Sequence, residues 1–414
     1  MQFDVVIVGG GAAGLFCART AGQRGRRVLL LEHNARLGNK ILISGGGRCN
    51  FTNLGATAAH YLTQGSPHFA KSALARCTAL DFLALVEHHG IAWHEKKLGQ
   101  LFCDHSSKQI LQMLEDECAD ARVKVRPNCR VSSIRRTGWS EDPDAVAERV
   151  ADQPTQSLEP PEWFLETSQG SVVTRSLVIA TGGLSFPKLG ATPFGYEVAR
   201  QFGVRLVPPR PGLVPLTLGE DDLTTFGELS GLSLDCEVSA GLEAPRFREH
   251  FLFTHRGLSG PAILQISSYC AAGEAIRLDL LPDQSALDLL TKEKAGGRDA
   301  KSALRSVWPD RFAAAWCARF ASSKPIAQMS QRELEALARR VHSWEIVPSG
   351  DEGYPKAEVT VGGVATSELS SKTLECRRVR GLFFVGEVVD ITGWLGGYNF
   401  QWAWASGHAA GQAV

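Results

Sequence analysis

Neither sign of charge is in excess in this chain of 414 residues. Lysine plus arginine and aspartate plus glutamate number 44 each, so the formal net charge is zero. Proteins that bind nucleic acids or anionic membranes usually carry a basic surplus, because it is attracted to phosphate groups. We therefore expect no nucleic-acid partner and no membrane partner. The sequence gives no indication of an oligomeric state.

Long apolar runs are also absent. No stretch reaches the roughly 18 consecutive apolar residues that a membrane-spanning helix requires. No basic leader with an apolar segment and a small-residue cleavage site opens the sequence, and residues 3–8 already have the pattern of a strand. We therefore expect a cytoplasmic protein.

Paired metal-binding and redox sequences are missing as well. The ten cysteines include no Cys-x-x-Cys pair, and the histidines form no His-Glu-x-x-His pattern. Those spacings bring ligands together on zinc or place two thiols side by side. We predict no metal site, and we interpret most of the cysteines as small buried side chains.

What the chain does contain is a glycine-rich turn between a strand and a helix. Residues 3–8 are nearly all apolar, as expected for a strand buried on both faces. Residues 13–24 have a helical pattern, and residues 28–31 form a second apolar stretch that ends at Glu32. Strand, turn, helix and strand together predict a βαβ unit that binds a dinucleotide.

The spacing Gly9-x-Gly11-x-x-Gly14 predicts a separate structural role for each glycine. Gly9 permits the tight turn, Gly11 leaves room for a pyrophosphate, and Gly14 lets the helix pack closely on the strand. The helix N-terminus then directs N–H groups at the phosphates. Glu32 is placed to accept hydrogen bonds from a ribose hydroxyl, which disfavours NADP here. FAD and NAD both remain open on these residues alone.

Two distant segments favour FAD. Residues 177–183 repeat the arrangement of an apolar strand that runs into glycines, and residues 381–390 do so again. In FAD enzymes of the glutathione-reductase type, a returning strand brings a carboxylate to the ribityl chain, a role that Glu387 or Asp390 would fill. A carboxylate that merely caps the strand end is the alternative for each.

The last helix is expected over residues 401–412, after Gly396 and Gly397. A helix N-terminus aimed at the flavin would stabilise negative charge on the reduced ring. A plain helix start with Asn399 as its cap is the alternative.

Residues 44–53 have the chemistry of an anion or flavin contact. Three successive glycines at 45–47 expose backbone N–H groups, and Arg48 could neutralise a phosphate or position an anionic substrate. Cys49 is either a redox partner of the flavin or a packed side chain. Lys40 is either a phosphate contact or a solvated surface lysine.

These sequences resemble a known family. Leu-Ile-Ser-Gly-Gly-Gly-Arg-Cys-Asn-Phe-Thr-Asn at residues 42–53 is similar to the signature of the BaiN/RdsA-like (YhiN-like) NAD(P)/FAD-dependent oxidoreductases. Residues 180–183, 253–261, 358–364, 386–390 and 396–403 resemble the same family. One departure is Phe194, which stands where the family usually has aspartate.

The resemblance implies an α/β fold. It consists of a glutathione-reductase-like FAD-binding Rossmann domain interrupted by an inserted β-barrel-like and helical domain. We place the FAD-binding parts at residues 1–190 and 356–414, and the insertion at residues 191–355 with its helical part at about 285–345. Residues 69–90 and 106–121 have helical patterns, and the acidic, proline-rich residues 140–161 are expected to form a surface excursion.

The function expected from this evidence is FAD-dependent hydride transfer to or from a small organic substrate. NAD(P)H is a candidate transient reductant, and O₂ a candidate oxidant. The alternatives are a flavin-dependent RNA-modifying enzyme, which the neutral charge disfavours, and a non-catalytic flavin-binding protein. His255, Cys49 and Arg48 are the candidates for catalysis.

The predicted cofactor-binding residues come from all of these segments. They are Gly9, Gly11, Ala12, Ala13, Gly14, Glu32, Lys40, Ser44, Gly45, Gly46, Arg48, Val131, Thr181, Gly182, Gly183, Gly386, Glu387, Asp390, Gly396, Gly397, Asn399 and Phe400.

Overall fold

The computed structural model describes residues 2–139, 162–241, 244–271 and 273–414. The surface excursion expected at residues 140–161 lies outside this part of the chain. The chain divides into two compact units. Unit 1 combines Met1–Arg210 with Val359–Val414, and unit 2 is Pro211–Glu358.

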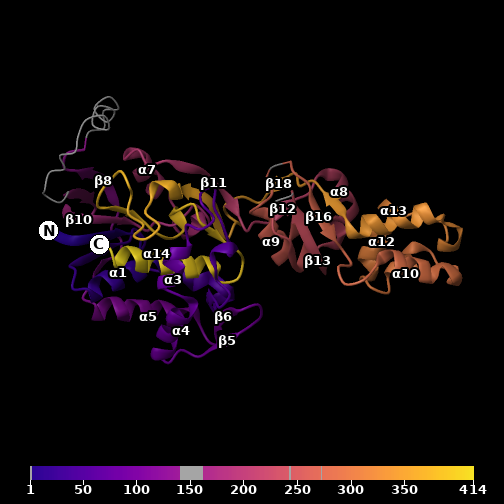
Figure 1. Ribbon diagram of the computed structural model, residues 1–414, viewed down its shortest axis with the longest axis horizontal. Helices are drawn as coiled ribbons and strands as arrows, with labels where there is room; N and C mark the ends of the chain where they lie inside the picture. Colours follow the sequence, from indigo (N-terminus) through magenta and orange to yellow (C-terminus); the bar gives the residue numbers. More distant parts are fainter. Residues whose placement is uncertain (1, 140–161, 242–243, 272) are drawn as a thin grey trace. The chain divides into compact units, whose positions relative to one another are not determined.

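Unit 1 is built on a seven-stranded sheet with the order β7-β2-β1-β10-β9-β8, in which β20 also pairs with β10 (Figure 1). The pairs from β7 to β10 and the β10–β20 pair are parallel, whereas β9 pairs antiparallel with both of its neighbours. The strands are β1 (Gln2–Val8), β2 (Val28–Leu31), β7 (Lys124–Arg126), β8 (Val131–Arg136), β9 (Trp163–Thr167), β10 (Val172–Ile179) and β20 (Leu382–Phe384).

Two of the helices of unit 1, α1 and α14, lie side by side (Figure 1). Their contact is close because small residues line it. A Cβ atom on Gly407 would lie 2.5 Å from the carbonyl oxygen of Ala13, and one on Gly411 would lie 2.6 Å from the Cβ of Thr20. The helices are α1 (Ala12–Gln23), α2 (Asn39–Ile43), α3 (Lys71–Arg76), α4 (Ala79–His88), α5 (Ser107–Asp120), α7 (Phe194–Gln201) and α14 (Tyr398–Gly411).

Three smaller sheets complete unit 1. Their strand orders are β3-β6-β5, β21-β4 and β11-β19. The sheets β3-β6-β5 and β21-β4 lie next to the start of α14, and they contain segments that are far from α14 in the sequence. The strands are β3 (Asn50–Asn53), β4 (Tyr61–Leu62), β5 (Trp93–Glu95), β6 (Gln100–Cys103), β11 (Leu206–Gly212), β19 (Val359–Val364) and β21 (Thr392–Gly393).

Unit 2 contains a second seven-stranded sheet, with the order β17-β16-β13-β14-β15-β12-β18. Within the described residues, its neighbouring strands pair antiparallel, and β17 and β18 remain as edges. The expected β-barrel is therefore not found, because the sheet is open. The strands are β12 (Leu216–Thr217), β13 (Ser233–Ala240), β14 (Phe247–Thr254), β15 (Gly257–Ser259), β16 (Ile276–Asp279), β17 (Trp344–Ile346) and β18 (Gly350–Asp351).

Helices α10 to α13 form a packed group, whereas α9 packs on β13 and β14 of the sheet. Helix α13 packs on α10, and Leu334, Leu337 and Val341 bury its apolar face. The helices are α8 (Glu220–Phe226), α9 (Pro261–Ser267), α10 (Ala286–Lys292), α11 (Ala300–Leu304), α12 (Asp310–Phe320) and α13 (Gln331–His342). No helix in the described part of the chain has the length and apolar character needed to cross a bilayer.

Candidate active site

The glycine turn between β1 and α1 has two tightly packed positions and one open position. A Cβ atom on Gly14 would lie 1.9 Å from the carbonyl oxygen of Gly9, and one on Gly9 would lie 2.4 Å from that of Ala180. Gly9 also has a φ of 112°, which L side chains rarely adopt. At Gly11, by contrast, a Cβ atom would meet nothing within 4 Å.

The open position lies at the start of a helix. Gly11 is the N-cap of α1, and no side chain caps this helix. The first N–H groups, which include those of Ala12 and Ala13, are therefore left for a ligand rather than for a protein acceptor. An open glycine before an uncapped helix fits the pyrophosphate of FAD.

Glu32 lies against the same turn. Its Oε2 atom accepts a hydrogen bond from the N–H of Gly10 at 2.8 Å, and its Oε1 atom accepts one from Asn34 at 2.8 Å. The side chain is only 8% exposed, and the Nδ1 atom of His33 lies 3.2 Å from Oε1. A carboxylate accepts more than two hydrogen bonds, so this fixed group keeps lone pairs for a ribose hydroxyl.

The turn after β10 carries a buried hydroxyl without a partner. The Oγ1 atom of Thr181 is buried and makes no hydrogen bond to any described residue. Gly182, which follows it, has a φ of 72°. A Cβ atom on Gly183 would lie 2.3 Å from the Oγ1 atom of Thr360 and 2.7 Å from Oε1 of Glu387. This turn thus brings the Thr-Gly-Gly segment against the return segment near residue 387.

Lys40 and Glu387 form an ion pair. The Nζ atom of Lys40 donates to Oε2 of Glu387 at 2.6 Å and to Oγ of Ser185 at 2.5 Å. Oε1 of Glu387 accepts from Oγ of Ser185 at 3.0 Å and from the N–H of Thr360 at 2.9 Å. Two residues proposed as separate cofactor contacts are therefore partners of each other across 347 positions of sequence.

Asp390 supports a loop. Its buried Oδ2 atom accepts a hydrogen bond from the N–H of Gln64 at 2.9 Å and from Oγ1 of Thr63 at 3.1 Å. Burial raises the pKa of this carboxyl group, and the two hydrogen bonds counteract that effect. Its role toward FAD stays a prediction.

The glycines at 45–47 form a left-handed turn, η1 (Ser44–Gly47), with φ angles of 56°, 65° and 84°. A Cβ atom on Gly46 would meet nothing within 4 Å, whereas one on Gly45 would lie 2.9 Å from the ring of Phe102. Arg48 follows the turn and is exposed, and no hydrogen bond or ion pair in the described part of the chain engages its guanidinium.

Cys49 is fully buried and has a φ of 49°. Burial raises the pKa of its thiol to about 12, and the neighbouring Cys103 adds to the effect. Because the thiolate is the reactive form, this environment disfavours a nucleophilic or redox role for Cys49. Packing explains the residue better.

The segment after Cys49 meets the start of α14. Gly397, the N-cap of α14, has a φ of 94°, and a Cβ atom on it would lie 2.3 Å from the carbonyl oxygen of Thr52. Asn53 donates to the carbonyl oxygen of Gly396 at 2.9 Å, and Oγ1 of Thr52 donates to Oε1 of Gln401 at 2.6 Å. The structure therefore joins the predicted flavin segment at 44–53 to the predicted helix start.

Three further predicted residues border this junction or the neighbouring turn. Oδ1 of Asn399 accepts from the N–H of Gly393 at 2.8 Å, so this residue closes a turn, while Gly397 holds the cap position. The ring of Phe400 stacks on Trp404, with centroids 5.6 Å apart. A Cβ atom on Gly386 would lie 2.8 Å from that of Ala13, which links the return segment to α1.

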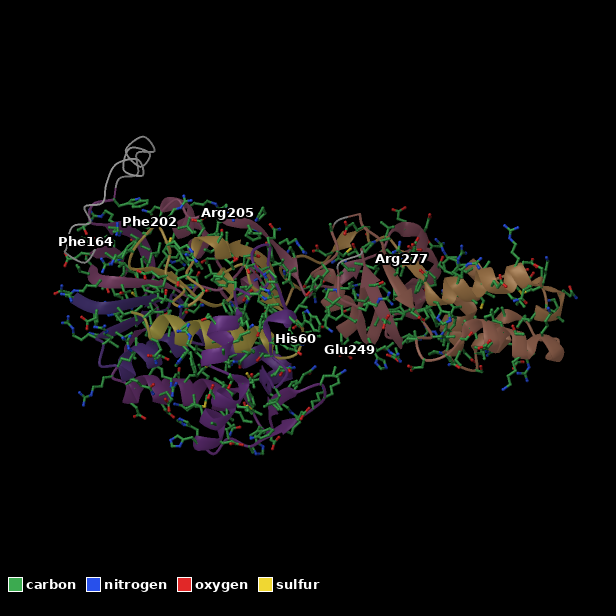
Figure 2. All side chains as sticks on the ribbon, viewed as in Figure 1. His60, Phe164, Phe202, Arg205, Glu249 and Arg277 are labelled. Carbon is green, nitrogen blue, oxygen red and sulfur yellow. The ribbon has the colours of Figure 1, made fainter. Side chains whose placement is uncertain are left out.

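His60 was not predicted from the sequence, and the structure places it beside this junction (Figure 2). Its ring stacks on Tyr398 at 4.8 Å and meets Trp394 edge-on at 4.8 Å. Burial lowers the pKa of His60, so the ring is neutral at neutral pH. No local sequence signal could have found it, because β4 and β21 bring the residues together.

Two predicted residues lie elsewhere. His255 belongs to unit 2, where it is exposed in the turn between β14 and β15. Val131 begins β8 and is buried in unit 1. Two residues before it, Cys129 donates its N–H to the carbonyl oxygen of Glu32 at 2.8 Å, so the chain passes the predicted ribose contact just before β8.

A family model described as the HI0933-like protein Rossmann domain matches residues 3–413. The chain belongs to the HI0933-like Rossmann family. The predicted resemblance is thus confirmed, and the chain is an FAD-dependent oxidoreductase with an α/β Rossmann-type fold.

Three full-length relatives of this HI0933-like chain have names that describe an activity. The ribosomal RNA dihydrouridine synthase of Escherichia coli is 47% identical, covering 99% of this chain and 98% of the relative. That of Haemophilus influenzae is 44% identical, with the same coverage. The 3-dehydro-bile acid delta(4,6)-reductase of Clostridium scindens is 28% identical, again with 99% and 98% covered.

Solved structures resemble the chain only in outline. The open conformation of a flavocytochrome c3 fumarate reductase has a TM-score of 0.45 at 16% identity, and the match covers 99% of this chain and 77% of that one. A score below 0.5 adds nothing to the family assignment.

The relatives overturn two predictions. The expectation of a small organic substrate, and that of no nucleic-acid partner, are wrong, since two full-length relatives above 40% identity are named for an action on ribosomal RNA. The charge argument failed because net charge is an average over the whole chain. A local basic surface can be balanced by acidic residues elsewhere.

Proposed function

We propose that this chain is a flavin-dependent ribosomal RNA dihydrouridine synthase. The observation that carries the proposal is the 47% identity to such an enzyme over 99% of the chain. The glycine turn at residues 9–14 supports it, because an open, uncapped helix start suits the FAD that such an enzyme needs.

Dihydrouridine differs from uridine by two hydrogen atoms added across the C5–C6 double bond of the base. The reaction is thus a reduction that consumes a hydride and a proton. Reduced FAD, when bound, supplies the hydride, and NAD(P)H is the reductant that we propose for it.

Different segments of unit 1 would hold different parts of FAD. The turn at residues 9–14 would hold the pyrophosphate, and Glu32 would accept from the ribose. The ring end would lie where residues 44–48 meet the start of α14, since Gly46 and Gly47 are left-handed and open and α14 begins without a side-chain cap. The Lys40–Glu387 pair would keep the return segment in place.

Arg48 is our candidate for a direct contact with the base. Hydride addition to uracil places negative charge on the carbonyl oxygen at C4, and an exposed guanidinium without a protein partner is suited to stabilise it. We expect Arg48→Met to retain FAD but to lower kcat by about 100-fold, with partial recovery in Arg48→Lys. An unchanged kcat would remove Arg48 from the reaction.

The test is direct. Purified yellow protein is incubated without oxygen with NADPH or NADH and protein-free ribosomal RNA, and the digested nucleosides are analysed by mass spectrometry. We expect dihydrouridine to form only when RNA, protein and reductant are all present. If no dihydrouridine forms with chemically reduced protein either, the proposed function fails. Formation with chemically reduced protein alone would overturn only NAD(P)H as the reductant.

A further inference from the structure

The neutral charge of the whole chain conceals an uneven distribution. Residues 285–342, which include helices α10 to α13, contain eleven lysines and arginines but only six aspartates and glutamates. The rest of the chain therefore has an acidic surplus of the same size. These helices group together within unit 2 (Figure 1).

Most of the acidic residues in this segment already have a partner. Asp299 accepts from the N–H of Ser302 at the start of α11. Asp310 pairs with Arg305, and Glu333 closes a capping box with Ser330 at the start of α13. Arg298, Lys324 and Arg319 also have carboxylate partners, namely Glu293, Glu333 and Asp222. The basic residues that stay without a carboxylate partner within the described residues therefore include those on the exposed side of α13.

Helix α13 presents the clearest basic face. Arg332, Arg339 and Arg340 are exposed, and their spacing of seven and eight residues places them on one side of the helix. No hydrogen bond or ion pair among the described residues engages the guanidinium of Arg332 or Arg339. Arg340 lies over the ring of Phe320 at 5.0 Å. The opposite side is apolar and buried, and consists of Leu334, Leu337, Ala338 and Val341.

Helix α10, on which α13 packs, ends in further basic residues. Lys292 is its last residue, and Lys294 follows two positions later. Both are exposed, and within the described chain neither Nζ atom has a hydrogen bond or ion pair.

We propose that the exposed face of α13, with Lys292 and Lys294, binds the phosphate backbone of the ribosomal RNA substrate. This inference rests on the proposed function, which requires an RNA partner. Guanidinium groups without protein partners suit phosphate oxygens, and each phosphate contact releases counter-ions. A membrane surface fits less well, because α13 buries its apolar face and offers no large apolar side chain to a bilayer.

The test compares three double variants of the full-length holoprotein. Arg332→Gln/Arg339→Gln removes the charge, and Arg332→Lys/Arg339→Lys keeps it. Arg130→Gln/Arg175→Gln removes two exposed charges from unit 1 as the matched control. Binding to protein-free ribosomal RNA is measured by filter retention over a series of salt concentrations, with FAD content as the check of folding.

We expect the Gln pair on α13 to weaken binding by about tenfold and to reduce the slope of log Kd against log salt by roughly one to two. The Lys pair should bind nearly as the wild type does, and so should the unit 1 control. An unchanged slope in the Gln pair would overturn the inference, and so would an equal loss in the control. Binding of wild type to anionic phosphatidylglycerol vesicles that the Gln pair abolishes, with RNA binding intact, would assign the face to membranes instead.

The two proposals fail separately. If the wild type binds RNA with the expected α13 dependence but forms no dihydrouridine, the proposed function fails and the RNA surface stands. If dihydrouridine forms and the Gln pair binds and reacts as the wild type does, only the α13 inference fails.

Discussion

Gly9, Gly11 and Gly14 are alike in the sequence pattern and different in their surroundings. Two of them are needed because a Cβ atom would overlap backbone within unit 1, and the third faces open space. The spacing pointed to the tight surroundings of Gly9 and Gly14 because those contacts are local, whereas the pyrophosphate contact at Gly11 stays a prediction. The Lys40–Glu387 pair and the place of His60 could not be predicted, since each depends on contacts between residues more than 300 positions apart.

This difference predicts that a valine has different effects at Gly11 and at Gly14. Gly11→Val should fold normally, because the backbone there is extended and unhindered, but the added side chain should block the pyrophosphate and give colourless protein. Gly14→Val should destabilise the fold itself. The measurements are the absorbance of bound flavin and thermal melting of both variants against wild-type protein stripped of FAD. A yellow Gly11→Val variant would contradict the assignment of the turn.

Asp390 predicts a pH dependence of stability. Burial raises its pKa in the folded state above the value of the unfolded chain, so the ionised group costs stability at neutral pH. That cost disappears as the pH falls through the folded pKa. We expect Asp390→Asn to melt at a higher temperature than wild type near pH 7, and the difference to shrink towards pH 4, in FAD-free protein.

If Asp390→Asn is less stable at every pH, the two hydrogen bonds to Thr63 and Gln64 outweigh the burial. A loss of FAD affinity in the same variant at unchanged apo stability would support the ribityl contact that the sequence suggested.

At the scale of elements, periodicity predicted what local residues decide. The apolar strands and the helix after the glycine turn lie within one or two residues of β1, α1 and β2. The helical pattern at residues 69–90 is two helices, α3 and α4. The break occurs at Thr78, whose side chain accepts from the N–H of Asp81 and begins a new helix with a capping box.

The contact between α1 and α14 holds the helix that follows the glycine turn, so we expect the cofactor site to depend on it. We expect Gly407→Ala to lower the free energy of unfolding by about 1–3 kcal/mol, because the new Cβ atom would press on the carbonyl oxygen of Ala13. FAD content should fall with it, since Ala13 belongs to the glycine turn. Gly227→Ala is the control, because its backbone is right-handed and a Cβ atom there would meet nothing within 4 Å. Stability equal to wild type in Gly407→Ala would contradict the close packing.

At the scale of the whole molecule, two predictions failed for the same reason. The strand pattern of residues 191–355 cannot say whether the edges of a sheet meet, and in the described residues β17 and β18 do not pair. Likewise, total charge cannot say where charges gather, and the basic surplus of residues 285–342 is invisible in the sum. The pairing of sheet edges and the clustering of charges both depend on the three-dimensional arrangement of residues, which composition does not specify.

The division into units predicts that flavin binding is separable from the insertion. Every proposed FAD contact belongs to unit 1, and β11 and β19 pair where the chain leaves and returns. We expect a chain in which residues 213–357 are replaced by a short Gly/Ser linker to bind FAD, as measured by absorbance, and to lose RNA affinity. A folded but colourless product would show that unit 2 takes part in holding the cofactor.

The glycine turn at residues 9–14 and the helix α14 that packs beside it stand almost at opposite ends of the printed sequence. During synthesis on the ribosome, the glycine turn is made near the start of translation and α14 near its end. A nascent chain interrupted before residue 398 lacks α14, the helix that packs on α1 beside the glycine turn. We therefore expect a chain to bind FAD only after its translation has passed α14.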